Sequence, residues 1–356
     1  MERYIAVDTG KFATKVAEYD AVQGKIRKFQ IRTKISEGDF RDDAIEDQTV
    51  IVEIDGNVYK IGNGARGGDA ALDTNKMSET HKLCTLTALA TLASAKEKDE
   101  INVAIGLPAK EWANVSKRED YKAYMLPTGD ITVSIKNNSQ APVIKKTFTI
   151  KNRFVYPESI GALFVDETLY SISPTSITGV IDIGNLNLNA VLFQGTEPKD
   201  EKSTTAELGG AVLISELSQE LSMNITACDE MITANILKSE DKCLPNNGNL
   251  TEEQVEASRQ IVKKVLREHA EKVKRCCRAR NWSLDLTNIV AIGGTSKDIE
   301  EELKEAFGNI TVLPNSHYCN AFGYLRMMCS NLLDKIIPLC DTEKNVKEIK
   351  EEEKSA

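Results

Sequence analysis

The stretch IAVDTGKFATK, residues 5–15, decides the fold. Two apolar residues and an alanine lead to Asp8, a Thr9-Gly10 turn follows, and the chain resumes at once as a strand that carries Lys15. Glycine permits a tight turn that bares backbone N–H groups, and concave rows of such groups bind anions. We therefore expect the strand to break so that amides, a carboxylate and a lysine converge on one phosphate-bearing ligand.

A second copy of this pattern lies half a protein further on. GVIDIGNLNLNAVLF, residues 179–193, aligns with residues 5–19, so that Asp182 matches Asp8 and a glycine follows in both copies. Self-similarity of this kind indicates a duplicated fold. Two such loops would clamp a polyphosphate from both sides. Their carboxylates would repel it unless Mg²⁺ were bound with it, directly or through water.

Two further glycine-rich segments belong to the same half. Residues 207–210, Glu-Leu-Gly-Gly, open a predicted helix whose N-terminus offers more N–H groups to phosphate. A predicted buried strand over residues 289–292 ends at Gly293-Gly294-Thr295. The missing side chains there would let a flat group such as adenine or its ribose approach the main chain.

Residues 156–164, YPESIGALF, predict the start of a helix with Pro157 in an early position. Glu158 beside it could polarise a water for in-line attack on a γ-phosphate, because phosphoryl transfer needs little beyond positioning and charge stabilisation. Taken alone, Glu158 is more often a first-turn carboxylate favoured by the helix dipole, and an isolated Asp-x-Gly is usually a turn. The ordered appearance of all the pieces favours the functional interpretation.

Length and composition limit the class of protein. A chain of 356 residues exceeds one ordinary core and predicts two domains, and 41% hydrophobic with 28% charged residues indicates a globular protein. A net charge of -9 argues against direct binding of nucleic acid. The eight cysteines form no Cys-x-x-Cys pair, so neither a zinc site nor a disulfide framework is expected. The sequence shows no signal peptide and no stretch of membrane-spanning length, which predicts a cytoplasmic protein without membrane contact.

Periodicity and capping residues predict the main elements. We expect an antiparallel pair over residues 3–8 and 14–19, and a helix at 78–97 that Ser78 caps. The other strands expected are 25–32, a hairpin within 48–62, 101–107, 130–136 and 143–150. The other helices expected are 209–222, 251–280, 298–307 and 316–338.

The order of these pieces resembles the actin and Hsp70-type ATPase superfamily, and most of all the bacterial plasmid-segregation actins of the ParM family. The matching segments are phosphate loop one (Asp8 to Lys15), the first connecting helix (Pro157 to Phe164), phosphate loop two (Asp182 to Asn189), the adenosine loop (Gly293 to Ser296) and the second connecting helix (Asn320, Ala321, Gly323). Lys11 departs from the pattern, because small residues are common there, and Ile183 leaves loop two without a hydroxyl.

The resemblance implies an α/β, duplicated ribonuclease-H-like fold of the actin and Hsp70 type, with two domains around a nucleotide cleft. Domain I would span residues 1–165 with a small subdomain at about 30–75, and domain II residues 166–315. Residues 316–340 would return to domain I as a helix, and a charged tail would occupy 341–356.

The resemblance also implies the site residues and the activity. Glu158 and Asp182 would be catalytic, and Asp8 and Asp182 would serve Mg²⁺. The nucleotide, ATP or GTP, would be held by Asp8, Thr9, Gly10, Lys11, Phe12, Lys15, Gly184, Asn185, Leu208, Gly209, Gly210, Gly293, Gly294 and Thr295. The activity implied is nucleotide-dependent polymerisation into filaments that hydrolysis destabilises. The partners implied are further copies of the chain and a DNA-binding adaptor of the ParR type, for plasmid segregation.

Other classes of protein fit the sequence less well. Asp-Thr-Gly is also the signature of an aspartic protease, but Asp182-Ile183-Gly184 lacks the hydroxyl that braces such a dyad, and long helices do not suit that all-β fold. An Hsp70-like chaperone would need a substrate domain after the ATPase. A small-molecule kinase of the same fold, or a monomeric ATPase, is the alternative to a filament-forming protein.

Overall fold

The computed structural model describes residues 1–42, 46–67, 75–165, 173–246, 248–284 and 288–339. The predicted tail at 341–356 lies outside these ranges. The chain divides into two compact units: the first contains Met1–Ser171 and the chain from Asn320 onward, and the second contains Ile172–Cys319. Each unit has its own β-sheet and its own hydrophobic core.

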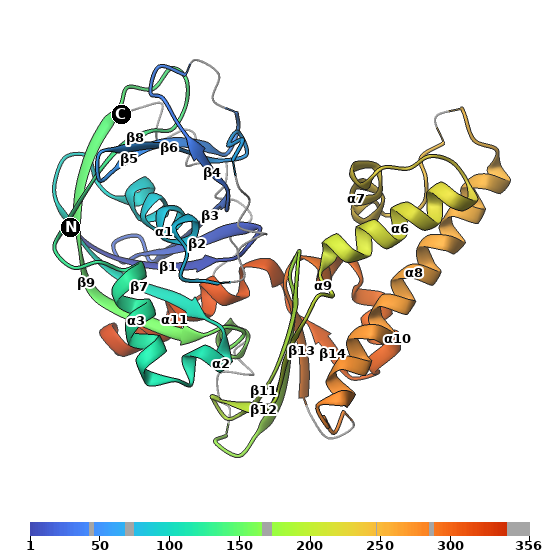
Figure 1. The fold of residues 1–356 in the computed structure, drawn as a ribbon. Coiled ribbons are helices and arrows are strands. Elements are labelled where there is room, and N and C mark those ends of the chain that lie inside the picture. Colours follow the sequence, from blue (N-terminus) through green and yellow to red (C-terminus); the bar gives the residue numbers. More distant parts are fainter. Residues whose placement is uncertain (43–45, 68–74, 166–172, 247, 285–287, 340–356) are drawn as a thin grey trace. The chain divides into compact units, whose positions relative to one another are not determined.

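The first unit contains a sheet of nine described strands in the order β3-β2-β1-β7-β9-β8-β5-β6-β4 (Figure 1). Its strands are β1 (Glu2–Thr9), β2 (Ala13–Asp20), β3 (Lys25–Arg32), β4 (Ile35–Glu37), β5 (Thr49–Ile54), β6 (Asn57–Gly62), β7 (Asp99–Leu107), β8 (Asp130–Lys136) and β9 (Ile144–Pro157). β1 pairs antiparallel with β2 and parallel with β7, and β7 pairs parallel with β9. The predicted antiparallel start is therefore confirmed.

Helices of the first unit pack against this sheet. They are α1 (Glu79–Leu92), α2 (Ala109–Trp112), α3 (Val115–Met125), α4 (Ala162–Val165) and α11 (Cys319–Leu333). The sheet curves around α1, whose buried residues join those of β1, β5, β7 and β8 in one core (Figure 1). Ser78 caps α1 as predicted, but the helix ends at Leu92 rather than residue 97. It stops because Ala93 turns to extended backbone and the amide of Ser94 donates to Asp99.

The main chain of α11 packs directly against the main chain of the segment just before α4. A Cβ on Gly323 would lie 2.2 Å from the carbonyl oxygen of Gly161, so only glycine allows this contact. Arg326, one helical turn further on, is buried and donates hydrogen bonds to the carbonyls of Phe164 and Ile337. These contacts fix the segment that follows β9 against α11.

The second unit contains a sheet of five described strands in the order β12-β11-β10-β13-β14. Its strands are β10 (Ile177–Ile183), β11 (Leu188–Gln194), β12 (Glu197–Ala206), β13 (Asn288–Ile292) and β14 (Ile310–Val312). β10 pairs antiparallel with β11, which pairs antiparallel with β12; β10 also pairs parallel with β13, and β13 with β14. The strands β3-β2-β1-β7-β9 have the same order and the same senses of pairing, which is the structural form of the duplication.

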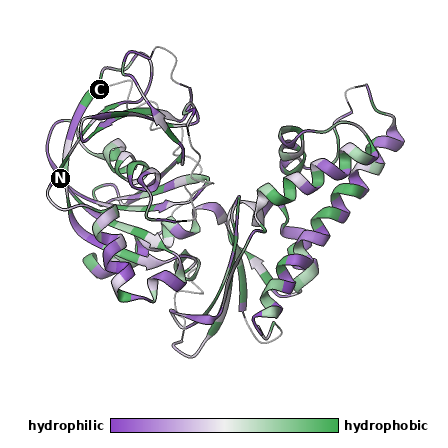
Figure 2. Cartoon of the chain, in the orientation of Figure 1, coloured by the Kyte–Doolittle hydropathy of each residue, from purple (hydrophilic) through white to green (hydrophobic). Residues whose placement is uncertain are grey.

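The helices of the second unit are α6 (Gly210–Asn224), α7 (Glu230–Lys238), α8 (Glu252–Ala279), α9 (Gly294–Asp298) and α10 (Glu300–Phe307), with a 3₁₀ turn, η2 (Ser316–Tyr318). α8 begins with the predicted capping box of Thr251 and Gln254. Its apolar residues fall on one face, and hydrophobic and hydrophilic segments alternate along its ribbon in Figure 2. That face joins α6, α10 and β10 in the core of the unit.

None of the helices in the described ranges has both the length and the hydropathy needed to cross a bilayer.

Candidate functional site

The turn between β1 and β2 brings the first predicted groups together. The amide of Gly10 donates to the carbonyl of Ala13 at 3.1 Å, which closes the turn. Asp8 lies opposite Lys15 in the strand pair, and the Lys15 ammonium is 3.5 Å from the Asp8 carboxylate. Asp8 and Thr9 are buried. The strand break therefore places a carboxylate and a lysine beside a tight main-chain turn.

The two residues at the tip of this turn are more exposed. Phe12 is 42% exposed, and the guanidinium of Arg32 lies 3.2 Å from the centroid of its ring, a cation–π contact. Lys11 is half-buried. Both predicted binding residues thus lie at the accessible edge of the turn.

Glu158 is held differently from the sequence expectation. β9 continues through Pro157, and α4 begins only at Ala162, so the predicted helix start at Pro157 is wrong. The strand ends because Ser159 takes a positive φ of 70°, with its amide donating to the side chain of Asn320. The amide of Glu158 donates to the carbonyl of Leu107 at 2.7 Å. Glu158 is therefore fixed by the sheet and by the start of α11, and not by a helix dipole.

Lys76 is a member of this group that the sequence interpretation missed. Its ammonium is 2.7 Å from Glu158 Oε1 and donates to the carbonyl oxygen of Thr9 at 2.6 Å. Burial alone would lower the pKa of Lys76, but the negative charges of Glu158 and Asp8 raise it above its usual value. No motif surrounds Lys76 in the sequence, where it reads as an ordinary lysine ahead of a helix cap.

α1 also contacts the turn between β1 and β2. The hydroxyls of Thr9 and Thr85 lie 2.8 Å apart, and both residues are buried. His81 contacts the N-cap Ser78, and burial together with the charges of Lys76 and Lys11 lowers the pKa of His81 to about 3. His81 is therefore neutral at physiological pH and adds no cation to the group.

In the second unit, three predicted segments converge on one turn. The carbonyl of Gly184 accepts hydrogen bonds from the amide of Gly210 at 3.0 Å and from the hydroxyl of Thr295 at 3.0 Å. The carbonyl of Asn185 accepts from the amide of Ala211 at 2.7 Å. The turn after β10, the start of α6 and the start of α9 are thus joined directly.

Glycine is required at two of these positions. Gly293 has a positive φ of 92°, and a Cβ there would lie 2.3 Å from the carbonyl oxygen of Ile183 and 2.6 Å from the carboxylate of Asp182. A Cβ on Gly209 would lie within 2.5 Å of the main chain of Asn185. Close main-chain packing of this kind leaves no room for a side chain.

The remaining predicted residues of the second unit lie around this turn. Asp182 is half-buried next to the end of β10, opposite Asn189 on β11. Gly294 begins α9 and has open space where a Cβ would stand. Leu208 packs against the hydrophobic core.

The predicted residues therefore assemble into two groups, one in each unit. We define the first cluster as Asp8, Thr9, Gly10, Lys15, Glu158 and Lys76. We define the second cluster as Asp182, Gly184, Asn185, Gly209, Gly210, Gly293 and Thr295. The two turns are closed alike: the amide of Gly184 donates to the carbonyl of Asn187 at 2.9 Å, three residues on, as Gly10 does to Ala13.

Both clusters offer groups that suit a phosphate and a divalent cation. Turn amides and Lys15 of the first cluster can hold phosphate oxygens. In the described ranges, no three His, Cys, Asp or Glu side chains gather closely enough to hold a metal by themselves. Mg²⁺ is usually bound through one or two carboxylates together with phosphate oxygens and water. The single aspartate of each turn fits this mode of binding.

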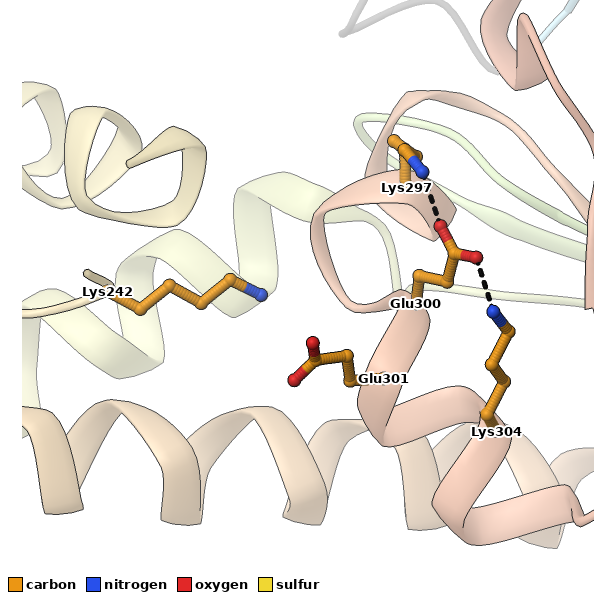
Figure 3. Close-up of a pocket in the computed structure, with 5 residues that line it drawn as sticks. All are labelled: Lys242, Lys297, Glu300, Glu301 and Lys304. Carbon is orange, nitrogen blue, oxygen red and sulfur yellow. Dashed lines mark hydrogen bonds and ion pairs between the residues drawn. The ribbon is translucent and has the colours of Figure 1, made fainter. Parts of the chain in front are cut away.

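An open hollow of about 370 Å³ lies elsewhere in the second unit, lined by Lys242, Lys297, Glu300, Glu301 and Lys304 (Figure 3). Glu300 pairs with both Lys297 and Lys304, so much of its charge is neutralised locally. None of the predicted site residues lines this hollow.

Comparison with known proteins shows which fold this chain shares. Residues 6–161 match the family model of the N-terminal domain of actin-like proteins. A search of curated proteins finds no match. Among solved structures, the Alp12 filament structure is 20% identical with a TM-score of 0.70, covering 93% of this chain and 99% of its own.

Two further structures extend the comparison. A 15-stranded ParM filament from Clostridium botulinum is 20% identical with a TM-score of 0.67, covering 92% of this chain and 99% of its own. The archaeal actin homologue Ta0583, in complex with ADP, is 16% identical with a TM-score of 0.66, covering 90% of this chain and 97% of its own. The fold is thus that of the actin homologues. Residues 6–161 are thus similar in sequence to the N-terminal domain of actin-like proteins, and nearly the whole chain shares the fold of the actin homologues.

The close packing at the second cluster can be tested with adjacent glycines. Gly293→Ala should lower the free energy of unfolding by about 2 kcal/mol or more, because it combines a strained φ with a main-chain clash. Gly294→Ala is the matched control and should change it by less than about 0.5 kcal/mol, since its Cβ meets open space. Urea unfolding measures both. Equal effects of the two substitutions would contradict the packing described.

Proposed function

We propose that this chain binds and hydrolyses ATP and that it polymerises into filaments in the cytoplasm. The observation that carries the proposal is the repeated turn: in each unit an aspartate next to the end of a buried strand precedes a glycine whose amide closes the turn three residues on. Turns of this kind suit phosphate, and two of them suit the two sides of one polyphosphate. The ADP complex of Ta0583, a protein with the same fold, supports a nucleotide as the ligand.

We propose that the first cluster engages the phosphates and the attacking water. Lys15 would balance phosphate charge, and Glu158 would accept the proton of the water that attacks the γ-phosphate. The turn of the second cluster, with the start of α6 hydrogen-bonded to it, would also contact the phosphates. The adenosine would lie against Gly293 and Gly294, of which Gly294 has open space where a Cβ would stand. Mg²⁺, held with Asp8 and Asp182 directly or through water, would neutralise phosphate charge.

Glu158→Ala tests the assignment of the catalytic carboxylate. We expect nucleotide affinity to stay within about threefold, because the turns and Lys15 remain, while hydrolysis slows by about 100- to 1,000-fold with the loss of one positioned group. Fluorescent-nucleotide binding and phosphate release measure the two quantities. Phosphate release at the wild-type rate would remove Glu158 from the mechanism.

The filament proposal is supported by the similarity of this chain to proteins whose structures are filaments, Alp12 and the Clostridium botulinum ParM. Within the same proposal, the ParM likeness favours plasmid segregation, with a DNA-binding adaptor that couples filaments to DNA. The net charge of -9 fits an adaptor better than direct contact with DNA.

Assembly can be measured by pelleting and by electron microscopy at micromolar protein. With ATP and Mg²⁺ we expect sedimentable filaments, and without nucleotide we expect the protein to stay in the supernatant. A parallel sample with GTP establishes which nucleotide drives assembly. Dispersed particles under every nucleotide condition would contradict the filament proposal and favour a monomeric ATPase or a small-molecule kinase of the same fold.

A further inference from the structure

Lys76 joins two groups of the first cluster that come from distant parts of the sequence. Its ammonium bridges the carboxylate of Glu158, at the end of β9, and the carbonyl of Thr9, at the end of β1. The Lys76 and Glu158 side chains are only 12% and 10% exposed. An ion pair that is buried to this extent has a defined geometry, unlike a surface pair that exchanges with water.

The position of Lys76 in the chain adds to this effect. It lies two residues before Ser78, the N-cap of α1, and α1 also contacts the turn through the Thr9–Thr85 hydroxyl pair. The main chain next to Lys76 is therefore held in place by α1, which packs against the curved sheet. Lys76 therefore connects the Glu158 carboxylate to the Asp8-Thr9-Gly10 turn.

We propose that Lys76 is a positioning residue for Glu158: its ammonium holds the carboxylate at a fixed place beside the Asp8-Thr9-Gly10 turn. This inference rests on the role proposed for Glu158 in hydrolysis. The Thr9 carbonyl and the Glu158 carboxylate share the Lys76 ammonium as a donor. The distance between a phosphate bound at the turn and a water held by Glu158 is therefore fixed. Lys15 pairs instead with Asp8, with its ammonium 3.5 Å from the Asp8 carboxylate.

The kinetic test compares Lys76→Met with Lys76→Arg. Because a misplaced catalytic group costs on the order of a hundredfold, Lys76→Met should lower kcat for ATP hydrolysis by about that factor, with KM within about threefold. Lys76→Arg keeps the charge and should recover part of the loss. In a Glu158→Gln background, Lys76→Met should have no further effect on kcat, because the group that it positions is already gone.

Lys136→Met is the matched control. Lys136 is a buried lysine of the same unit whose ammonium donates to the carbonyls of Phe40 and Asp42, away from the first cluster. It should leave kcat within about threefold of the wild-type value. An equal loss in Lys136→Met, an additive loss in the Glu158→Gln background, or a Lys76→Met effect confined to KM would each overturn the positioning role.

A second measurement does not depend on hydrolysis. Thermal unfolding of Lys76→Met, Glu158→Gln and the double variant forms a cycle without nucleotide. We expect the double variant to lose less than the sum of the two single losses, because each single variant already removes the ion pair between the two side chains. Additive losses would overturn the pair itself. Absence of ATP hydrolysis in the wild-type chain would overturn the proposed function instead, while this cycle would still decide whether Lys76 and Glu158 are coupled.

Discussion

The structure of both clusters depends on a hairpin turn in which a glycine amide donates to the carbonyl three residues on. The turn interrupts a mostly buried strand next to an aspartate, and the chain returns as the antiparallel neighbour of that strand. Because the register is fixed, the aspartate faces a known position on the returning strand: Lys15 opposite Asp8, and Asn189 opposite Asp182. The duplication of this turn places a comparable turn edge in each unit, and the difference between lysine and asparagine gives the two edges different charge.

Charge balance distinguishes the first cluster from the second. Two buried carboxylates, Asp8 and Glu158, would repel each other and any phosphate if they were alone. Lys15 and Lys76 each pair with one of them, so the cluster is neutral before any ligand binds. The second cluster relies instead on main-chain donors and on close glycine packing around Asp182. The first cluster thus carries paired side-chain charges, and the second is held together by main-chain hydrogen bonds.

Much of this arrangement was predictable from the sequence, because strand-breaking glycines and the repeat leave a local signal. The Asp8 turn, the Asp182 turn, the capping box of α8 and the antiparallel start of the sheet all follow from short-range patterns. The surroundings of Glu158 were not predictable from the sequence. The strand runs through Pro157 because it pairs with β7, and the left-handed Ser159 donates its amide to the side chain of Asn320. Lys76 gave no signal at all, because its partners lie 67 and 82 residues away and no spacing rule connects them.

Calorimetric titration with Mg²⁺ and ATP is the most direct test of the proposal that both turns serve the same nucleotide. We expect one nucleotide per chain, with the Mg²⁺-dependent part of the affinity lost in Asp8→Ala and equally in Asp182→Ala. Two independent binding events, or an Asp182→Ala variant that keeps the wild-type affinity with and without magnesium, would contradict it.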